Sequence, residues 1–387
     1  MDYVVIARKY RPQTFAEVAG QGIIARTLVN AIAKQRVAHG FLFTGPSGVG
    51  KTTMARILAK GLCCEHGPTA EPCGVCDHCR MIAESIHPDV FEMDAASHNG
   101  VDDIRDLAES ASYAPSQARF RVFILDEVHM LSTNAWNALL KLLEEPPPHV
   151  YFIFATTEIE KVPATVVNRC QRFDFRAIDI DDIVERLRAV CAGEGVAVDD
   201  ALLYRLARAA GGGMRDAQTL LDQLIAVSEE TITAADLDLL LGAARSEDIA
   251  AIAGSLLAGQ GKEAIEIFDR LGAGGVAAAT FLEQLIDHFR MLMLVQTCGA
   301  ESAPVRRLGS CGDAVLAQAE QPNEKILRIC QILIGSQQAL RGGVDARLQL
   351  ELAFVRIARL GDMLDVEGLL RRIDRLERSA GTAGNPR

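Results

Sequence analysis

The chain has 387 residues and a formal net charge of −11 at pH 7. At roughly 100–200 residues per domain, this length predicts two or three domains. The composition, 49% hydrophobic and 5% aromatic, is typical of a folded protein and argues against extensive disorder. The negative charge argues against a protein that coats nucleic acid by bulk electrostatics, although a local basic track remains compatible with it.

The N-terminal sequence MDYVVIARKYRPQTF carries charges from its second residue and lacks the apolar core of a secretory signal. The apolar stretches are shorter than the ~18–20 uncharged residues that a membrane-spanning helix needs. We therefore expect a cytoplasmic protein without membrane contact. Its cysteines should be reduced thiols or metal ligands rather than disulfides.

Three apolar runs in the first part of the chain predict buried strands, at residues 40–44, 121–126 and 150–155. The runs do not alternate with polar residues, and helical patterns separate them, which is typical of a parallel sheet covered on both faces. Residues 1–178 are therefore predicted to form an α/β nucleotide-binding domain.

From residue 179 onward the strand signals stop and amphipathic helical patterns begin. The first group of helices predicts a small lid over residues 179–242, with helices at 181–192, 199–210, 214–227 and 233–241. The second group predicts an all-α domain over residues 243–368, with helices at 246–258, 261–271, 277–297, 322–341 and 345–361. Residues 369–387 are expected to contain a helix end and a fraying tail.

Directly after the first strand, Gly45–Thr52 fits the pattern G-x-x-x-x-G-K-[ST] of a phosphate-binding loop, or P loop. Its glycines let backbone N–H groups surround phosphates at a helix N-terminus, Lys51 reaches the β and γ oxygens of ATP, and Thr52 coordinates Mg²⁺. The residues predicted to bind the nucleotide here are Gly45, Ser47, Gly48, Val49, Gly50, Lys51, Thr52 and Thr53.

Two acidic residues, Asp126 and Glu127, end the second strand. Asp126 is predicted to organise the Mg²⁺ shell together with Thr52, and Glu127 to polarise the attacking water. The alternative is that both acids form a solvated helix cap.

Two arginines are candidates for neutralising charge on the transferred phosphoryl group. Arg215 lies at a helix start in the lid, and Arg169 follows the third strand and a short helix that begins near Pro163. For each, spacing alone leaves a surface salt bridge equally open.

Five of the ten cysteines lie within residues 63–79. Four thiolates are enough to close a tetrahedral Zn²⁺ site, and a closed site is structural rather than catalytic. From spacing alone an iron–sulfur cluster is the rival, since C-x2-C-x2-C also occurs in ferredoxins. His66 or His78 could each replace a thiolate.

Several separated segments together resemble the gamma/tau family of bacterial DNA polymerase III clamp-loader ATPases, which belong to the AAA+ superfamily. The resemblance is dense over residues 3–242 and continues as a helical pattern to about residue 368. The segments are YRPQTF at 10–15, the P loop, the cysteine insert, DAAS at 94–97, DEVHML at 126–131, LLK at 139–141, EEP at 144–146, ATT at 155–157 and Arg169-Cys170.

The resemblance implies a role for each matching residue. Thr157 would be a sensor of the γ-phosphate, Arg215 a second sensor in the same chain, and Arg169 an arginine finger inserted into a neighbouring subunit's site. Asn168 stands where the family's motif has Ser. This difference leaves the arginine finger intact and changes a residue of the loop that carries it. The walls of the adenine pocket would include Ala7, Arg11 and Val18.

The resemblance also selects Cys64, Cys73, Cys76 and Cys79 as zinc ligands, in a module at about residues 62–82 inserted into the AAA+ domain. It makes residues 243–368 a collar that holds a pentamer of this chain's copies with the delta and delta-prime subunits. Its further partners would be the sliding clamp and primed-template DNA, with polymerase and replicative helicase reached through a longer form. Candidates for DNA contact are Asn99, Arg105 and Lys141, against an equal expectation of solvated surface.

Two other classes of function are alternatives to the clamp-loader motor. A non-catalytic assembly scaffold is disfavoured because Lys51, Thr52, Asp126 and Glu127 are all present. A protein unfoldase is disfavoured because residues 91–113 contain no aromatic-hydrophobic-glycine triplet for a pore loop.

Overall fold

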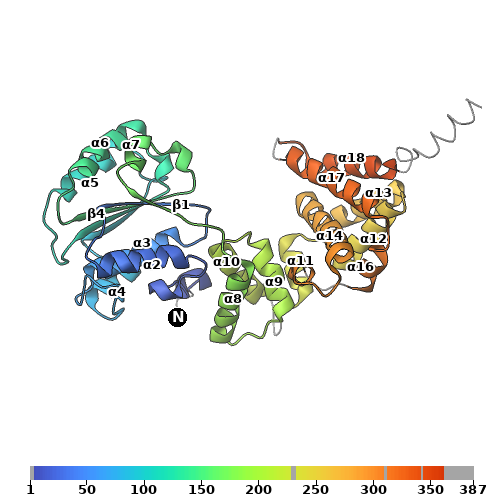
Figure 1. Cartoon of the computed structure of the whole chain (residues 1–387), viewed down its shortest axis with the longest axis horizontal. Helices are drawn as coiled ribbons and strands as arrows, with labels where there is room; N and C mark the ends of the chain where they lie inside the picture. The colour runs from blue at the N-terminus through green and yellow to red at the C-terminus, as the bar shows by residue number, and fades with distance from the viewer. Residues whose placement is uncertain (1–3, 228–231, 309–311, 341–342, 361–387) are drawn as a thin grey trace, which may run out of the picture. The chain divides into compact units, whose positions relative to one another are not determined.

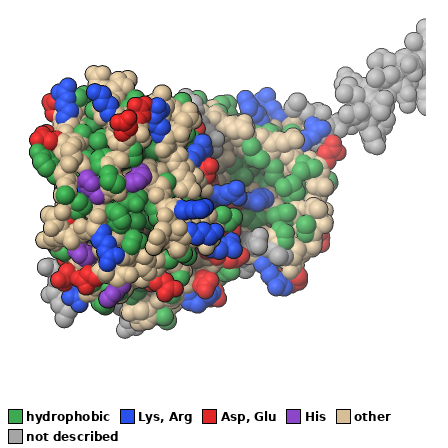
Figure 2. All heavy atoms as spheres, turned by 60° about the vertical axis from the view of Figure 1, so that its left-hand side comes forward, with side chains coloured by type: hydrophobic (Ala, Val, Ile, Leu, Met, Phe, Trp, Pro, Cys, Tyr) green, Lys and Arg blue, Asp and Glu red, His purple; other side chains and the backbone are tan. Residues whose placement is uncertain are grey.

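The computed structural model describes residues 4–227, 232–308, 312–340 and 343–360. The chain forms two compact units, Met1–Thr231 and Ile232–Arg387 (Figure 1). Among the described residues, no helix is both long enough and apolar enough to cross a bilayer. Figure 2 shows acidic and basic side chains interspersed over the face that is turned to the viewer.

The first unit contains a five-stranded parallel sheet with the strand order β2-β3-β4-β1-β5. The three central strands are buried over nearly their whole length and agree with the predicted runs. The strands are β1 (Gly40–Thr44), β2 (Val90–Asp94), β3 (Arg121–Asp126), β4 (Val150–Thr156) and β5 (Gln171–Asp174).

The two edge strands, β2 and β5, escape the sequence analysis because most of their side chains are not buried. Val90 is the buried residue of β2 and Phe173 that of β5. An edge strand pairs on one side only and does not need an apolar run, so hydrophobic patterning does not reveal it.

Helices cover both faces of the sheet, because successive side chains of a strand point to opposite faces. Phe41 and Phe43 of β1 pack in the core with α2 (Gly22–Ala33) and α3 (Lys51–Cys63). Leu42 packs in the core of the other face. The helices of that face are α5 (Val101–Ala111), α6 (Thr133–Glu144) and α7 (Ala164–Val167).

Three helices form the lid within the same unit and agree with the prediction to within a few residues. They are α8 (Ile180–Glu194), α9 (Asp200–Ala209) and α10 (Met214–Val227), which pack on one another, while the short α1 (Ile6–Lys9) packs on α10. The fourth helix that the sequence grouped with the lid, α11 (Ala234–Leu241), belongs by its contacts to the second unit.

The second unit is all-helical in its described part, as predicted. Helix α14 lies at its centre and contacts α12, α15, α16, α17 and α18, and its Phe281, Leu285 and Phe289 are fully buried. Two short helices, α15 and α16, were not predicted, and residues 369–387 lie outside the described residues. The helices after α11 are α12 (Ser246–Leu257), α13 (Gly261–Ala273), α14 (Ala278–Cys298), α15 (Ala303–Leu308), α16 (Asp313–Gln318), α17 (Asn323–Leu340) and α18 (Ala346–Ala358).

A buried carboxylate fixes the starts of β2 and β3. Asp89 has no exposed surface and pairs with the Arg121 guanidinium at 3.2 Å. It also accepts the backbone N–H groups of Ser116, Gln117 and Ala118 at 2.7–2.9 Å. Burial alone would raise the pKa of this carboxyl, but the N–H groups and Arg121 outweigh it and lower that pKa to about 2.

We expect Asp89→Asn to lower the free energy of unfolding of the first unit by about 3 kcal/mol at pH 7, because it leaves Arg121 buried and unpaired. The folded pKa lies below the ~3.9 of an unfolded Asp, so the carboxylate contributes fully above about pH 5 and its contribution disappears between about pH 4 and 2. The difference between wild type and variant should shrink in that window. Urea unfolding followed by the fluorescence of Trp136, the single tryptophan, measures it.

The matched control is Asp102→Asn, since the side chain of Asp102 is 92% exposed. It should change the unfolding free energy by less than about 0.5 kcal/mol. An equal loss in both variants, or a difference that does not depend on pH, would contradict the account of Asp89.

Candidate nucleotide site and cysteine cluster

The P loop connects β1 to α3 and has room only for glycine at its first residue. Gly45 has φ +143°, and a Cβ there would lie 2.3 Å from the carbonyl oxygen of Phe175. Its N–H donates to the Thr156 carbonyl at 3.2 Å. Gly48 and Gly50 also have positive φ, a conformation that other residues rarely adopt. The loop therefore presents its backbone, without intervening side chains, at the carboxyl edge of the sheet.

Lys51 is 6% exposed and donates through Nζ to the carbonyl oxygens of Gly45 and Pro46 at 2.8 and 2.7 Å. Burial lowers the pKa of its ammonium below the ordinary value, while the carboxylates of Glu127 and Asp126 act in the opposite direction. A desolvated cation of this kind favours an anionic ligand.

The Thr52 hydroxyl donates to Asp126 Oδ2 at 2.5 Å. The other carboxylate oxygen of Asp126 accepts the Glu127 N–H at 2.9 Å. The two residues that the sequence predicts as Mg²⁺ ligands thus lie together, with oxygen atoms of the type that Mg²⁺ prefers.

Two residues hold the Glu127 carboxylate: His129, which follows its own strand β3, and Thr157, which follows β4. The backbone of Glu127 is left-handed, with φ +48°. The Thr157 hydroxyl donates to Glu127 Oε2 at 3.2 Å, and His129 Nδ1 lies 3.3 Å from the same oxygen. His129, whose side chain is only 9% exposed, also lies 3.1 Å from Thr156 Oγ1 and 3.3 Å from a Glu158 oxygen.

His129 lies in the run DEVHML, but the sequence pattern indicates no role for it. The signal that could have found it is its place two residues after Glu127. That spacing puts a polar ring beside the carboxylate once the chain turns at the end of β3.

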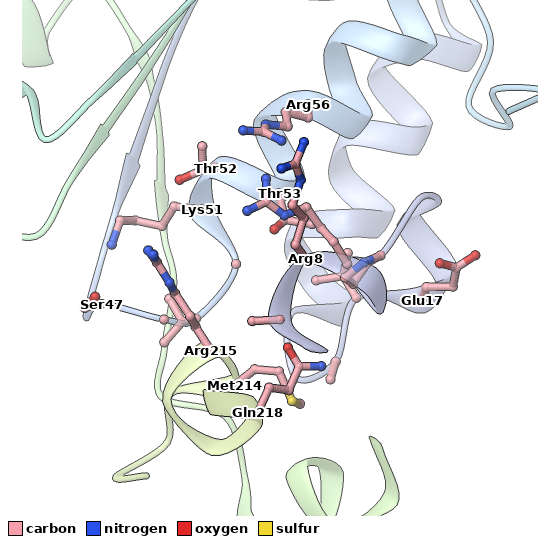
Figure 3. Close-up of a pocket in the computed structure, with 18 of the residues that line it drawn as sticks. Arg8, Glu17, Ser47, Lys51, Thr52, Thr53, Arg56, Met214, Arg215 and Gln218 are labelled. Carbon is pink, nitrogen blue, oxygen red and sulfur yellow. The ribbon is translucent and has the colours of Figure 1, made fainter. Parts of the chain in front are cut away.

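The lid reaches the P loop through the first turn of α10. The Arg215 N–H donates to the Gly48 carbonyl at 3.3 Å, and a Cβ on Gly48 would lie 3.0 Å from an Asp216 carboxylate oxygen. Figure 3 shows Met214 and Gln218 below the P loop and the Arg215 side chain extending from the lid toward the side of Lys51, while Arg56 and Arg8 lie on the side away from Lys51.

These elements enclose a cavity of about 470 Å³ within the first unit. Most of the residues predicted to bind the nucleotide line it. They are Ala7, Arg11, Val18, Ser47, Gly48, Val49, Gly50, Lys51, Thr52, Thr53, Asp126, Glu127 and Arg215. Gly45 is not among the lining residues and contacts Lys51 through its carbonyl.

The cavity wall also contains residues for which the sequence gave no signal. Several cations share this wall. Burial lowers the pKa of Arg11, which is predicted to wall the adenine pocket, and the like charge of Arg56 lowers that pKa further. The lining residues that sequence reasoning missed include Arg8, Glu17, Arg56, Ala83, Glu84, Ser85, Ile178, Arg186, Met214 and Gln218.

Arg169 is not among the residues that line this cavity. Its guanidinium donates to the Thr165 carbonyl at 2.8 Å and pairs with Glu144 at 2.5 Å, and its side chain is 35% exposed.

The three candidates for DNA contact lie on or next to α5 and α6. Arg105 pairs with the exposed Asp102 at 3.0 Å, and Lys141 lies on α6. The Asn99 carbonyl accepts the Ser132 N–H at 3.5 Å.

The four selected cysteines come together at the far end of α3. The sulfur atoms of Cys64, Cys73, Cys76 and Cys79 all lie within 4.8 Å of one another. The Cys76 N–H points to Cys73 Sγ at 3.4 Å and the Cys79 N–H to Cys76 Sγ at 3.5 Å. A tetrahedral zinc site with Zn–S bonds of about 2.3 Å has sulfur atoms about 3.8 Å apart, so the donor set fits such an ion.

The other candidate ligands of the module have partners elsewhere or lie outside this cluster. The Cys63 thiol donates to the Phe120 carbonyl at 3.6 Å, and His78 Nδ1 lies 2.8 Å from His87 Nε2. Within the described part of the chain, the metal-competent group that includes these cysteines contains neither His66 nor His78.

Comparison with known proteins gives matches to three family models in succession along the chain. "DNA polymerase III, delta subunit" matches residues 20–179, "DNA polymerase III clamp loader subunit, ATPase lid domain" matches 182–230, and "DNA polymerase III subunits gamma and tau domain III" matches 232–373. The tau subunit of DNA polymerase III from Bacillus subtilis (strain 168) is 39% identical over 383 residues, which cover 97% of this chain and 68% of that protein. The chain belongs to the gamma/tau family of DNA polymerase III subunits.

Two further relatives extend the comparison. The gamma/tau subunit from Mycobacterium tuberculosis (strain ATCC 25618 / H37Rv) is 40% identical over 97% of this chain and 66% of its own length. The tau subunit from Escherichia coli (strain K12) is 38% identical over 92% of this chain and 55% of its own length. The chain thus spans between 55% and 68% of the length of these three gamma/tau relatives.

Among solved structures, the Holliday junction branch migration motor RuvB of Thermotoga maritima is similar with a TM-score of 0.45 and 18% identity, over 64% of this chain and 79% of that one. Membership of the gamma/tau family confirms the resemblance found in the sequence. It also confirms the order of a P-loop ATPase domain, a lid and a helical third domain.

We expect Glu127→Gln to reduce ATP turnover by at least about 100-fold while ATP still binds, because the amide keeps the size of the side chain and removes its capacity to accept a proton. Lys51→Ala should instead weaken binding itself. Steady-state turnover and equilibrium binding of a fluorescent ATP analogue separate the two effects.

The control is Glu109→Gln on α5, whose carboxylate bonds the Tyr113 hydroxyl and is not among the cavity lining. It should leave turnover unchanged. Full turnover in Glu127→Gln would mean that another group activates the attacking water.

Proposed function

We propose that this chain is the ATP-driven motor of a DNA polymerase III clamp loader, which opens the ring-shaped sliding clamp and loads it onto primed-template DNA. The observation that carries the proposal is the convergence of Lys51, Thr52, Asp126 and Glu127 on one cavity, in a chain of the gamma/tau family. A non-catalytic scaffold would have no use for this complete set of groups.

The roles follow from the contacts around the cavity. Lys51 neutralises charge on the β and γ phosphates. Thr52 and Asp126 would hold Mg²⁺, which when bound would neutralise charge on the transferring phosphoryl group. Glu127 accepts a proton from the attacking water, and Thr157 orients Glu127 through the 3.2 Å hydrogen bond. Arg215 acts from the lid, whose first turn is hydrogen-bonded to the P loop.

Arg169 acts in trans, in the site of a neighbouring subunit. Two observations support this role. The Arg169 guanidinium is partly exposed and pairs with Glu144 on the surface, and Arg169 does not line the cavity of its own chain. A site completed by a neighbour hydrolyses ATP only when two subunits are docked in register. The neighbours would be copies of this chain, with the delta and delta-prime subunits, in a pentamer held by the second unit.

DNA would be contacted through its phosphates by Asn99, Arg105 and Lys141. Asn99 precedes α5, Arg105 lies on α5 and Lys141 on α6, and these two helices pack against each other. Phosphate contacts of this kind position a protein on DNA without reading its sequence.

The metal of the cysteine cluster is Zn²⁺. Four thiolates close a tetrahedral site and leave no open position, which suits a structural ion.

The function is tested by ATP turnover of the full chain reconstituted with its loader partners, with and without sliding clamp and primed-template DNA. We expect stimulation of at least about tenfold that needs both additions, because binding energy from clamp and DNA is used to complete the active geometry. Turnover that is indifferent to both would contradict clamp loading and retain only the ATPase assignment.

The matched variants in that assembly are Arg169→Ala and Arg172→Ala. Arg169→Ala should bind ATP normally and lose at least about 1,000-fold in turnover, the typical effect of an arginine finger. Arg172, an exposed arginine of β5 that pairs with Asp174, serves as control and should have no effect. Equal turnover in both variants would remove the finger.

Metal analysis of the purified chain should find one Zn²⁺ per molecule, because the four thiolates bind it in preference to harder ions. Cys76→Ser should lose the metal, whereas Cys63→Ser should keep it, since Cys63 lies outside the cluster. Iron with a visible charge-transfer band, or no metal, would contradict the zinc assignment.

A further inference from the structure

The cysteine cluster and the nucleotide cavity are joined by one short helix, α4 (Asp77–Glu84). Its N-cap is the metal ligand Cys76, whose sulfur accepts the Cys79 N–H in the first turn. Its last residues, Ala83 and Glu84, and its C-cap Ser85 line the nucleotide cavity. The two sites therefore lie at opposite ends of an eight-residue helix, which is about 12 Å long.

A chain of polar contacts continues from this helix into the cavity. The Ser85 hydroxyl donates to Glu92 Oε2 at 3.4 Å, and Glu92 Oε1 accepts from the Arg56 guanidinium at 2.6 Å. Arg56 lines the cavity, and its Nε is buried without a hydrogen-bond partner. The position of this cation therefore depends on Glu92, and Glu92 is oriented by the end of α4.

Helix α3 makes a second connection between the two sites, because it begins at Lys51 of the P loop and its C-cap is the metal ligand Cys64. The module loop is fitted closely against its last turn. The Thr69 N–H donates to the Gly61 carbonyl at 2.9 Å, and a Cβ on Gly61 would lie 2.7 Å from the Thr69 carbonyl oxygen.

We propose that the metal module is one wall of the nucleotide site and that metal bound to the four cysteines strengthens nucleotide binding. An isolated helix of eight residues is not stable in water, so α4 depends on its packing against α3, where Ile82 is buried, and on what holds its ends. Metal–thiolate bonds fix its N-terminal end, and the end that faces the nucleotide is then fixed as well. This inference rests on the proposed zinc and nucleotide sites and adds a coupling between them.

Coupling of two binding sites is reciprocal. If metal strengthens nucleotide binding by some factor, nucleotide must strengthen metal binding by the same factor. A purely local role for the metal, in which it holds only its own loop, would give a factor of one in both directions.

The experiment measures the dissociation constant of the full chain for a fluorescent ATP analogue, before and after treatment with a nitrogen-ligand chelator that takes Zn²⁺ and leaves Mg²⁺ in solution. We expect about tenfold weaker binding after chelation, within the usual range of coupling between sites. The reciprocal measurement is the Zn²⁺ affinity of the chain in competition with the chelator. Saturating ATP should raise it by the same factor.

Ser85→Ala tests the coupling without touching a metal ligand. It should keep one Zn²⁺ and weaken nucleotide binding about threefold, the effect of losing one hydrogen bond. Its matched control is Glu71→Gln, which changes an exposed side chain of the same module and should leave nucleotide binding unchanged. In Arg56→Gln the effect of chelation should shrink, because the cation that the module positions is gone.

The outcomes separate the two proposals. Failure of the zinc-loaded wild type to bind the analogue would contradict the nucleotide site itself. Normal binding that is identical before and after chelation, with Trp136 fluorescence unchanged, would overturn the coupling alone. If chelation unfolds the first unit, Ser85→Ala and the reciprocal measurement decide. A wild-type nucleotide affinity in Ser85→Ala, together with a Zn²⁺ affinity that ATP does not raise, would overturn the coupling.

Discussion

Hydrogen bonds between the parallel strands β1, β4 and β3 align the strand ends on which the nucleotide site depends. In this register Thr44 lies opposite Thr156, and Leu125 lies opposite Phe154. The P loop follows Thr44, the acids follow Leu125, and Thr157 follows Thr156, so these groups meet at one edge without any side chain having to reach far. Gly45 then fits against the Phe175 carbonyl, where a larger residue would push the loop away from the edge.

The chain has a net charge of −11, yet the wall of the cavity beside the P loop collects cations. Lys51 and Arg11 are both buried enough for the pKa of each to fall below its ordinary value. Cations that have lost water in this way are costly unless an anion compensates them. Local charge at the site is therefore opposite to the charge of the whole chain, and the local charge is what a nucleotide meets.

The module that carries the four cysteines forms part of the wall of the cavity beside it. It enters the chain where α3 ends, so its position relative to the P loop is set by a helix of thirteen residues. The return path through α4 brings Ala83, Glu84 and Ser85 to the cavity. Because the return to β2 passes the cavity, the four cysteines and the cavity beside the P loop end up with a common wall.

Much of the site could be predicted from the sequence because its parts are local. Gly45–Thr52, Asp126-Glu127 and the four cysteines are short runs whose residue types are dictated by phosphate, magnesium and thiolate chemistry. The three central strands and most helices after residue 179 were also predictable, since burial on both faces or on one stripe leaves a clear hydrophobic pattern. The domain order and the family follow from these same segments.

The tertiary structure alone decided the contacts between residues far apart in the chain. Arg56 meets Glu92 across 36 positions, and Thr157 meets Glu127 across 30; no local pattern encodes such a pairing. The polar edge strands β2 and β5 were missed for a related reason, since their place in the sheet depends on neighbours rather than on their own hydrophobicity. Periodicity reports which face of an element is buried, but only folding decides what that face lies against.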